Sequence, residues 1–241
     1  MRRALLAVGG LIFSGYFSSA QTVTPALPGP PWIRIDREQL CVTNGVVSSL
    51  TDGQLAIDTP SSRAVVRVAT AQTAEIRFHY LGPSESSKPL ASGELRRQIG
   101  LKLRAQDTCN LVYAMWHIEP DSRIAVSVKR NPGKRTHEEC GARGYLNIRP
   151  GRSVSIPQVR PGEQHTLRAE LRGSDLTLVA DGHIVWEGTL GNRVSEFDGP
   201  VGLRTDNARF QFSYYAIGAA SGVELSGRAE RAGPCLQSRG D

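Results

Sequence analysis

The sequence has no apolar run long enough to cross a membrane and no excess of charge of one sign. A transmembrane helix needs about 20 apolar residues, whereas the longest apolar stretch covers only residues 4–13. The 29 Lys and Arg residues are interspersed with 23 Asp and Glu residues, for a net charge of +6. This balance gives little support to nucleic-acid binding. A hydrophobic content of 39% with 22% charged residues excludes a collagenous, coiled-coil or wholly disordered chain.

Several motifs that would identify a reaction are also missing. The chain has no G-x-S-x-G nucleophile elbow, no H-E-x-x-H zinc motif and no G-x-x-x-x-G-K-[ST] phosphate loop. The five histidines lie in separate segments without the spacing of metal ligands. The sequence therefore predicts the localisation and the fold of the protein more clearly than its activity.

The first 20 residues have the pattern of a secretory signal peptide. Arg2 and Arg3 precede the apolar stretch 4–13, and Ser18-Ser19-Ala20 precedes the expected cleavage before Gln21. This pattern predicts a secreted or periplasmic protein that enters an oxidising compartment, where thiols pair.

The four cysteines are far apart, and none of them forms a C-x-x-C pair. In an exported protein this spacing favours two disulfides over a zinc site. Three connectivities are possible. We favour Cys109 with Cys140, which closes a local loop, and Cys41 with Cys235, which joins the two ends of the chain.

The remaining sequence divides into three parts. Residues 21–38 form a proline-rich linker, because the prolines between Thr24 and Pro31 remove backbone donors. Trp32, among these prolines, is either a strand start or an exposed anchor. Residues 39–225 form the folded domain, and residues 226–241 form a loosely ordered tail that Cys235 pins.

Within the domain, apolar and polar residues alternate with a period of two. Residues 74–80 and 99–103 each predict a strand with one buried face, and further strands fit 110–119, 123–130, 144–148, 153–159, 165–171, 175–180, 183–187, 201–204 and 208–217. Arg172-Gly173-Ser174 and Asp181-Gly182 predict tight hairpin turns. Many short strands without a convincing helix predict an all-β fold of two packed antiparallel sheets.

Three segments carry a resemblance to a known superfamily. They are Gly100-Leu101-Lys102-Leu103-Arg104-Ala105-Gln106-Asp107 with Asn110 and Tyr113, the hairpin 165–182 with its Asp-Gly turn, and Gly199-Pro200-Val201-Gly202-Leu203-Arg204-Thr205 with Phe210 and Phe212. In this order they resemble laminin-G-like domains of the concanavalin A-like lectin and glucanase superfamily. The last segment is also similar to bacterial 3-keto-disaccharide hydrolase-like domains. The resemblance implies a jelly-roll sandwich, with a sugar or protein ligand on its concave sheet or at the loop rim.

Some relatives carry a catalytic motif or a calcium site. The glucanases carry E-x-D-x-x-E on one strand, since an acid and a nucleophile flank the glycosidic bond about 5 Å apart. The chain lacks this motif: Glu75 stands alone, and Glu138 and Glu139 are adjacent and would face opposite ways in a strand. No cofactor is predicted. Calcium, used by some relatives, would need converging oxygen ligands, for which Asp107, Asp206 and Asn207 are candidates that also suit ordinary turns.

The segment 110–119 presents two different faces. Alternation places Val112, Ala114, Trp116 and Ile118 on an apolar core face, and Tyr113, Met115, His117 and Glu119 on the opposite face. The predicted ligand-binding residues are Tyr113 and His117, joined by Lys102 and Arg104 on the preceding strand and Lys129 on the following one. Aromatic rings beside charged donors suit sugars. A polar outer face without a ligand is the alternative interpretation.

The loop 129–137 is the most basic stretch of the chain. It is either a solvated turn or a contact for an acidic polysaccharide, held at its base by a Cys109–Cys140 disulfide. Trp116 and Trp186 alternate with core positions and are predicted to pack in the interior.

These observations favour a secreted, non-catalytic glycan-binding β-sandwich. Its partner would be a glycan or a cell-envelope polysaccharide, with no nucleic acid and no membrane span. Two alternatives stay open: a carbohydrate-active enzyme of the 3-keto-disaccharide hydrolase type, and a protein-interaction module without a sugar ligand.

Overall fold

The computed structural model describes residues 32–67 and 70–218. The predicted signal peptide, the first part of the predicted linker and the predicted tail lie outside these residues. Cys235 also lies outside them, so the pairing of Cys41 with Cys235 stays a prediction.

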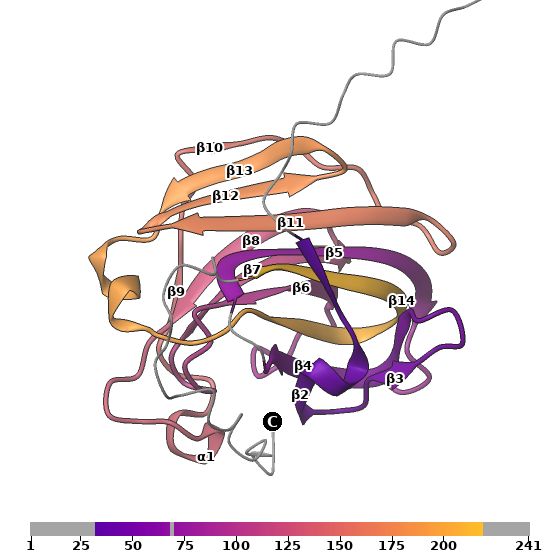
Figure 1. The fold of residues 1–241 in the computed structure, drawn as a ribbon, viewed down its shortest axis with the longest axis horizontal. Helices are drawn as coiled ribbons and strands as arrows, with labels where there is room; N and C mark the ends of the chain where they lie inside the picture. The colour runs from indigo at the N-terminus through magenta and orange to yellow at the C-terminus, as the bar shows by residue number, and fades with distance from the viewer. Residues whose placement is uncertain (1–31, 68–69, 219–241) are drawn as a thin grey trace, which may run out of the picture.

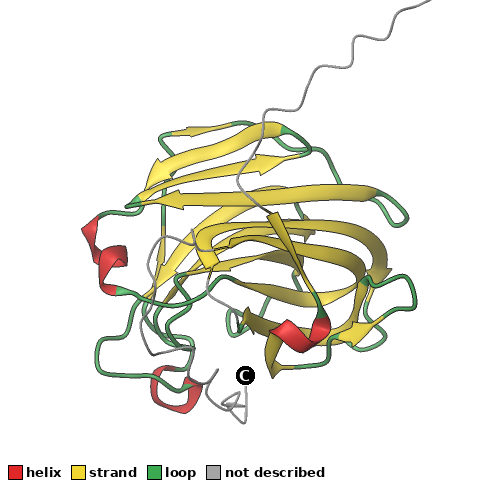
Figure 2. Ribbon diagram, in the orientation of Figure 1, coloured by secondary structure: helices red, strands yellow, loops and turns green. Residues whose placement is uncertain are grey.

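The described chain is almost entirely antiparallel β-structure, as predicted (Figure 2). Its strands are β1 (Trp32–Ile35), β2 (Leu40–Asn44), β3 (Ser48–Ser49), β4 (Leu55–Val66), β5 (Thr70–Pro83), β6 (Arg97–Leu103), β7 (Leu111–Glu119), β8 (Arg123–Lys129), β9 (Tyr145–Asn147), β10 (Arg152–Ser153), β11 (Gln164–Arg172), β12 (Asp175–Ala180), β13 (His183–Thr189) and β14 (Gly202–Gly218). One four-residue helix, α1 (His137–Cys140), and two short 3-10 turns, η1 (Arg37–Gln39) and η2 (Asn192–Glu196), complete the described part. No described helix is long and apolar enough to cross a membrane.

The strands form one continuous ladder that curls into a two-layered sandwich. The ladder runs in the order β10-β13-β12-β11-β5-β14-β6-β7-β8-β9 (Figure 1). The long strand β14 belongs to both layers, since residues 202–206 pair with β6 and residues 208–218 pair with β5. Asn207, between the two halves, has a φ of 55°. Strand β4 runs along both halves of β14 on its other edge.

The core lies between the layers and is built from aromatic rings. Trp116 of β7 meets Phe78 of β5 edge to face, with ring centroids 5.7 Å apart, and Phe78 meets Phe210 of β14 in the same way. Strands β5 and β7 are not neighbours in the ladder, so this contact shows that their sheets face each other. Trp116 and Trp186 are both buried, as predicted.

The alternation predicted for β7 is confirmed. Val112, Ala114, Trp116 and Ile118 belong to the main core, whereas Tyr113 and Met115 form a separate small cluster on the other face. The predicted hairpin turn at Asp181-Gly182 is also present, with φ values of 49° and 81° in the positive region that a type I′ turn requires. The other predicted hairpin joins β11 to β12 at Gly173, whose φ is 59°.

Several predicted elements differ from the structure: β2 and β3 were not predicted, and the predicted strands 201–204 and 208–217 form the single strand β14. Residues 32–35 lie in the predicted linker but form β1, which pairs with β14. The predicted strand 153–159 is limited to β10, Arg152–Ser153. No strand was predicted at β4, because Asp58, Pro60 and the serines after it interrupt its alternation. Pairing with β14 overrides this weak local pattern.

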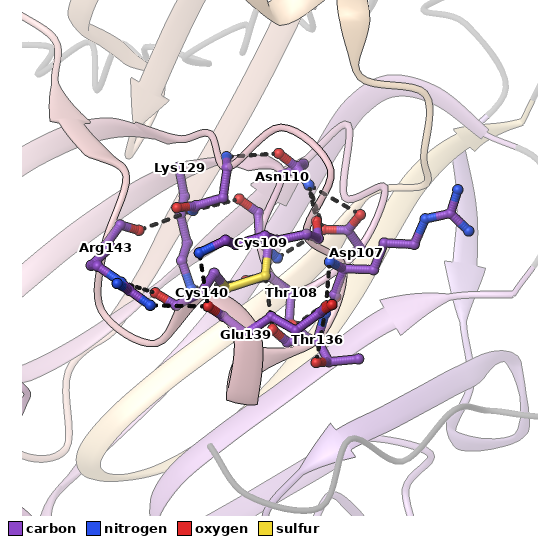
Figure 3. The surroundings of a disulfide bond; sticks show 12 residues. Asp107, Thr108, Cys109, Asn110, Lys129, Thr136, Glu139, Cys140 and Arg143 are labelled. Carbon is purple, nitrogen blue, oxygen red and sulfur yellow. Dashed lines mark hydrogen bonds between the residues drawn. A yellow bond between two sulfur atoms is a disulfide. The ribbon is translucent and has the colours of Figure 1, made fainter.

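The predicted disulfide between Cys109 and Cys140 is present, with Cα atoms 5.9 Å apart (Figure 3). It joins the segment before β7 to α1. The helix is short, but its start is well capped, since Glu139 accepts hydrogen bonds from the backbone N–H and the hydroxyl of Thr136. The disulfide therefore fixes the basic loop 129–137 against the end of the sheet.

Candidate functional site

An open cleft of about 1230 Å³ lies over the face of β6, β7 and β8 that points away from the core. Its lining includes alternate residues of β4, β6, β7 and β14, nearly all of β8, parts of β9 and the loop before β6, and it extends to residues 153–156 and to Val185 and Trp186 of β13. The polar and aromatic lining residues include Arg63, Lys88, Arg96, Gln98, Lys102, Tyr113, His117, Arg123, Lys129, Tyr145, Arg204 and Asp206, and Met115 lies among them.

The strand register arranges the floor in rows across the sheet. One row contains Asp206, Gln98, His117 and Arg123, which are successive partners on β14, β6, β7 and β8. A second row contains Lys102, Tyr113 and Ser127. Between them Gly100 faces Met115, and an added Cβ there would lie 2.4 Å from the Ala114 carbonyl oxygen. A side chain at position 100 would therefore force the floor apart.

A buried ion cluster anchors the first row. Asp206 is 1% exposed and accepts hydrogen bonds from Arg63 Nη2 and Arg204 Nε, each at 2.8 Å, and from Gln98 Nε2 at 2.5 Å. Burial alone would raise the pKa of Asp206, but the charges of Arg63 and Arg204 outweigh it and hold that pKa below its usual value. Asp206 is therefore a structural counter-ion at neutral pH.

Two tyrosines stack at the other end of the floor. The rings of Tyr113 and Tyr145 lie 6.0 Å apart with 22° between their planes, and the Arg204 guanidinium lies 5.0 Å above the Tyr113 ring. Tyr113 is only 5% exposed, whereas Tyr145 on β9 is 42% exposed. The ring that a ligand can reach is therefore mainly Tyr145, and Tyr113 supports it from below.

His117 lies between two arginines. Arg123 Nε donates to His117 Nδ1 at 3.1 Å, and Arg96 Nη1 lies 3.4 Å from His117 Nε2. Burial, followed by the positive charges of Arg96, Arg123 and Arg204, lowers the pKa of His117 to about 3. The imidazole is therefore neutral at physiological pH.

Lys129 is held beside the disulfide. Its Nζ donates to the Thr108 carbonyl at 3.0 Å and lies 5.3 Å from the centre of the Tyr145 ring. Figure 3 shows this lysine next to the Cys109–Cys140 bond. The disulfide loop thus positions one cation of the cleft against the exposed tyrosine.

The structure brings four of the five predicted residues together. Lys102, Tyr113, His117 and Lys129 all line the cleft, although their role in ligand binding stays a prediction. Arg104 does not join them. It lies beyond the end of β6 with a φ of 45°, which breaks the alternation, and its guanidinium donates to the carbonyls of Phe197 and Gly173 outside the cleft lining.

Sequence reasoning missed most of the polar floor. The missed residues are Arg63, Arg96, Gln98, Arg123, Tyr145 and Arg204. Arg204 and Asp206 stand two positions apart on β14, as do Gln98 and Gly100 on β6, so alternation could have placed them on one face. Arg63 could not be assigned to this face from the sequence, because β4 itself was not predicted.

Acidic groups are scarce in the cleft. Within residues 32–67 and 70–218, Asp206 is the one carboxylate lining it, and its oxygens are engaged by Arg63, Arg204 and Gln98. Asp107, another calcium candidate, accepts hydrogen bonds from the Cys109 backbone and the Asn110 amide. The described part of the chain contains no group of three His, Cys, Asp or Glu residues arranged to hold a metal ion.

No family model matches the sequence, and no curated protein does. Several solved structures have a fold similar to that of this chain. The carbohydrate binding module CBM66 from Bacillus subtilis is 14% identical, with a TM-score of 0.50, over 72% of this chain and 91% of the module. The metal-free carbohydrate recognition domain of Emp46p is 12% identical over 76% and 89%, with a TM-score of 0.47. LamAcat from Zobellia galactanivorans is 14% identical over 70% and 79%, with a TM-score of 0.43. At such identities the likeness to the module shows the fold alone, a β-sandwich of the jelly-roll type.

Proposed function

We propose that the protein is a secreted, non-catalytic glycan-binding module whose ligand lies in the cleft over β6, β7 and β8. The observation that carries this proposal is the half-exposed Tyr145 ring, stacked on Tyr113 and surrounded by polar side chains. The apolar face of a sugar ring packs on an aromatic ring, while its hydroxyl groups need hydrogen-bond partners close by.

Two further observations support the proposal. The jelly-roll fold is one that a carbohydrate binding module also has. The Cys109–Cys140 disulfide is typical of proteins in an oxidising compartment, in agreement with the signal-peptide pattern of residues 1–20. A cell-envelope or other extracellular polysaccharide is therefore the proposed partner.

The cleft gives no comparable support to sugar hydrolysis by two carboxylates. That mechanism needs an acid and a second carboxylate facing one bond. Among the described lining residues Asp206 is the one carboxylate, and it is buried beneath two arginines. Binding without bond cleavage is the function that these side chains favour.

The test is a glycan array probed with the oxidised chain starting at Gln21. We expect binding to at least one carbohydrate class and at least a tenfold loss of affinity in Tyr145→Ala. Leu146→Ala is the matched control, because Leu146 is the next residue of β9 and is exposed but does not line the cleft. Its affinity should be unchanged.

Three results would overturn the proposal. They are an array without any carbohydrate binding, equal losses in Tyr145→Ala and Leu146→Ala, and release of reducing sugar or turnover of a 3-keto-disaccharide by the wild-type chain. Recovery of a protein ligand together with an empty array would favour the interaction module instead.

A further inference from the structure

The cleft carries much more positive than negative charge. Its described lining includes seven Lys and Arg residues and one carboxylate, the cations being Arg63, Lys88, Arg96, Lys102, Arg123, Lys129 and Arg204. The carboxylate, Asp206, already serves Arg63 and Arg204. A concave surface lined by charges of one sign attracts ligands of the opposite sign. The charge of the cleft therefore indicates an anionic ligand.

The clearest place for an anion is the contact of His117 with its two arginines. A neutral imidazole has one N–H donor and one acceptor nitrogen, whereas a guanidinium only donates. The 3.1 Å hydrogen bond from Arg123 makes Nδ1 the acceptor, so we assign the proton to Nε2. The Nε2–H group then faces Arg96 Nη1 at 3.4 Å. With this tautomer, both groups at the contact are hydrogen-bond donors.

The ion pair of Arg96 with Glu94 does not involve the nitrogen that contacts His117. Arg96 Nη2 donates to Glu94, whose side chain is half exposed and is not part of the cleft lining. Nη1 is therefore the arm of the guanidinium that points toward His117. An acceptor oxygen placed beside the contact could receive hydrogen bonds from both Arg96 Nη1 and His117 Nε2. Charge-assisted bonds of this kind are among the stronger hydrogen bonds in proteins.

The rest of the cleft favours a sugar as the carrier of that oxygen. His117 and Tyr113 are four residues apart on β7, a distance of about 13 Å along a strand. The cleft thus has arginines at one end, and the tyrosine stack with Lys102 and Lys129 at the other. A polymer of uronic acids offers an apolar ring face and a carboxylate in each unit, and so matches both ends. A nucleic acid would rely on phosphate contacts and base stacking instead.

We infer that the ligand is an acidic polysaccharide whose uronate carboxylate binds between Arg96 and His117, with Arg123 fixing the imidazole. Arg96 contacts the carboxylate in this arrangement, and Arg123 is a positioning residue that holds the His117 ring. This inference rests on the proposed function, because it names the class of glycan that the cleft selects.

The test compares a polyuronate with its carboxyl-reduced form, which keeps the same backbone and linkages but lacks the charge. We expect the wild-type protein to bind the polyuronate at least tenfold more tightly. Arg96→Gln should remove most of this preference, because it lowers the affinity for the polyuronate by a much larger factor than the affinity for the reduced polymer. Arg97→Gln is the matched control, since Arg97 is the adjacent residue but pairs with Glu119 and does not line the cleft. It should keep the preference.

Arg123 is tested with the same two polymers. A residue that only stabilised the fold would not change the ratio of the two affinities. Arg123→Gln should weaken polyuronate binding by a larger factor than binding of the reduced polymer, with an unchanged circular dichroism spectrum. Arg123→Lys should restore part of the loss, because the charge returns without the planar fork of the guanidinium.

The outcomes separate this inference from the proposed function. Equal binding of both polymers would overturn the inference and leave glycan binding intact. Failure of the whole glycan array would overturn both. Tighter binding to single-stranded DNA or polyphosphate than to the polyuronate would show a general anion site and would also overturn the inference. Binding to sulfated glycans but not to the polyuronate would contradict the carboxylate assignment.

Discussion

Replacement of Asp206 by asparagine should destabilise the protein severely. The change keeps the shape of the side chain but removes the charge that balances Arg63 and Arg204 in the cleft floor. Asp206 accepts three hydrogen bonds at 2.5–2.8 Å, and the asparagine amide would turn an N–H₂ group toward one or more of those donors. Removal of one partner from a buried ion pair typically costs about 3–5 kcal/mol. We expect a loss in that range at neutral pH.

The measurement is urea unfolding at pH 7, followed by tryptophan fluorescence. Asp58→Asn is the control, because it is the same substitution at an exposed position of β4. It should change the free energy of unfolding by less than about 0.5 kcal/mol. In an Arg63→Met background the additional cost of Asp206→Asn should shrink by at least about 1 kcal/mol, since residues of one ion cluster are coupled.

The pH dependence of this effect has a defined sign. The folded pKa of Asp206 lies below its ordinary 3.8, so its stabilisation is present at neutral pH and is lost as pH falls from about 3.8 through the folded value. Two results would refute the interpretation of Asp206 as the counter-ion of the floor. One is a cost of Asp206→Asn below about 1 kcal/mol at pH 7, and the other is the same cost in the Arg63→Met background as in the wild type.

Three further predictions concern the core, the disulfide and the buried histidine. Trp116→Ala removes a fully buried ring that packs on Phe78 and should cost about 3–5 kcal/mol in urea unfolding; a loss under 1 kcal/mol would show that the two sheets do not depend on this contact. The double change Cys109→Ser and Cys140→Ser opens a loop with a sequence separation of 31 and should cost about 3–4 kcal/mol, while mass spectrometry of the unreduced wild type should show the linked peptides. The pKa of His117 falls from 6.5 to about 3 on folding, so the neutral His117 ring should not lower the free energy of unfolding above pH 6.5. On acidification from pH 6.5 to pH 5 that free energy should decline by up to about 1.4 kcal/mol per pH unit, because only the unfolded state then binds the proton. His117→Gln should flatten this decline, and an unchanged slope would contradict the low pKa.

The local parts of the fold were predictable because each depends on neighbouring residues. Alternation on β7 placed Trp116 on the core face and Tyr113 on the opposite face, and the Asp181-Gly182 dipeptide identified its hairpin, since both patterns act over a few positions. The site was only partly predictable. It is assembled by pairing between strands that are distant in the sequence, such as β4 with β14, where Arg63 lies opposite Arg204.

Arg104 and Tyr145 show the limits of alternation. Arg104 continues the period of β6 in the sequence, but the strand ends at Leu103 and the positive φ of Arg104 turns its side chain away. Tyr145 lies on a three-residue strand, too short to show a period, and it reaches the cleft through pairing with Lys129. Strand ends and short edge strands are set by tertiary pairing, which a local pattern does not report.

The sharing of β14 between both layers has a consequence for how the molecule opens. Ladder hydrogen bonds of both sheets are made by one uninterrupted strand, and β4 lies beside both of its halves. Neither sheet can therefore detach while the other keeps its full set of partners. Amide hydrogen exchange along 202–218 should proceed through a single cooperative event close to global unfolding, so that the floor of the cleft remains as rigid as the interior beneath it.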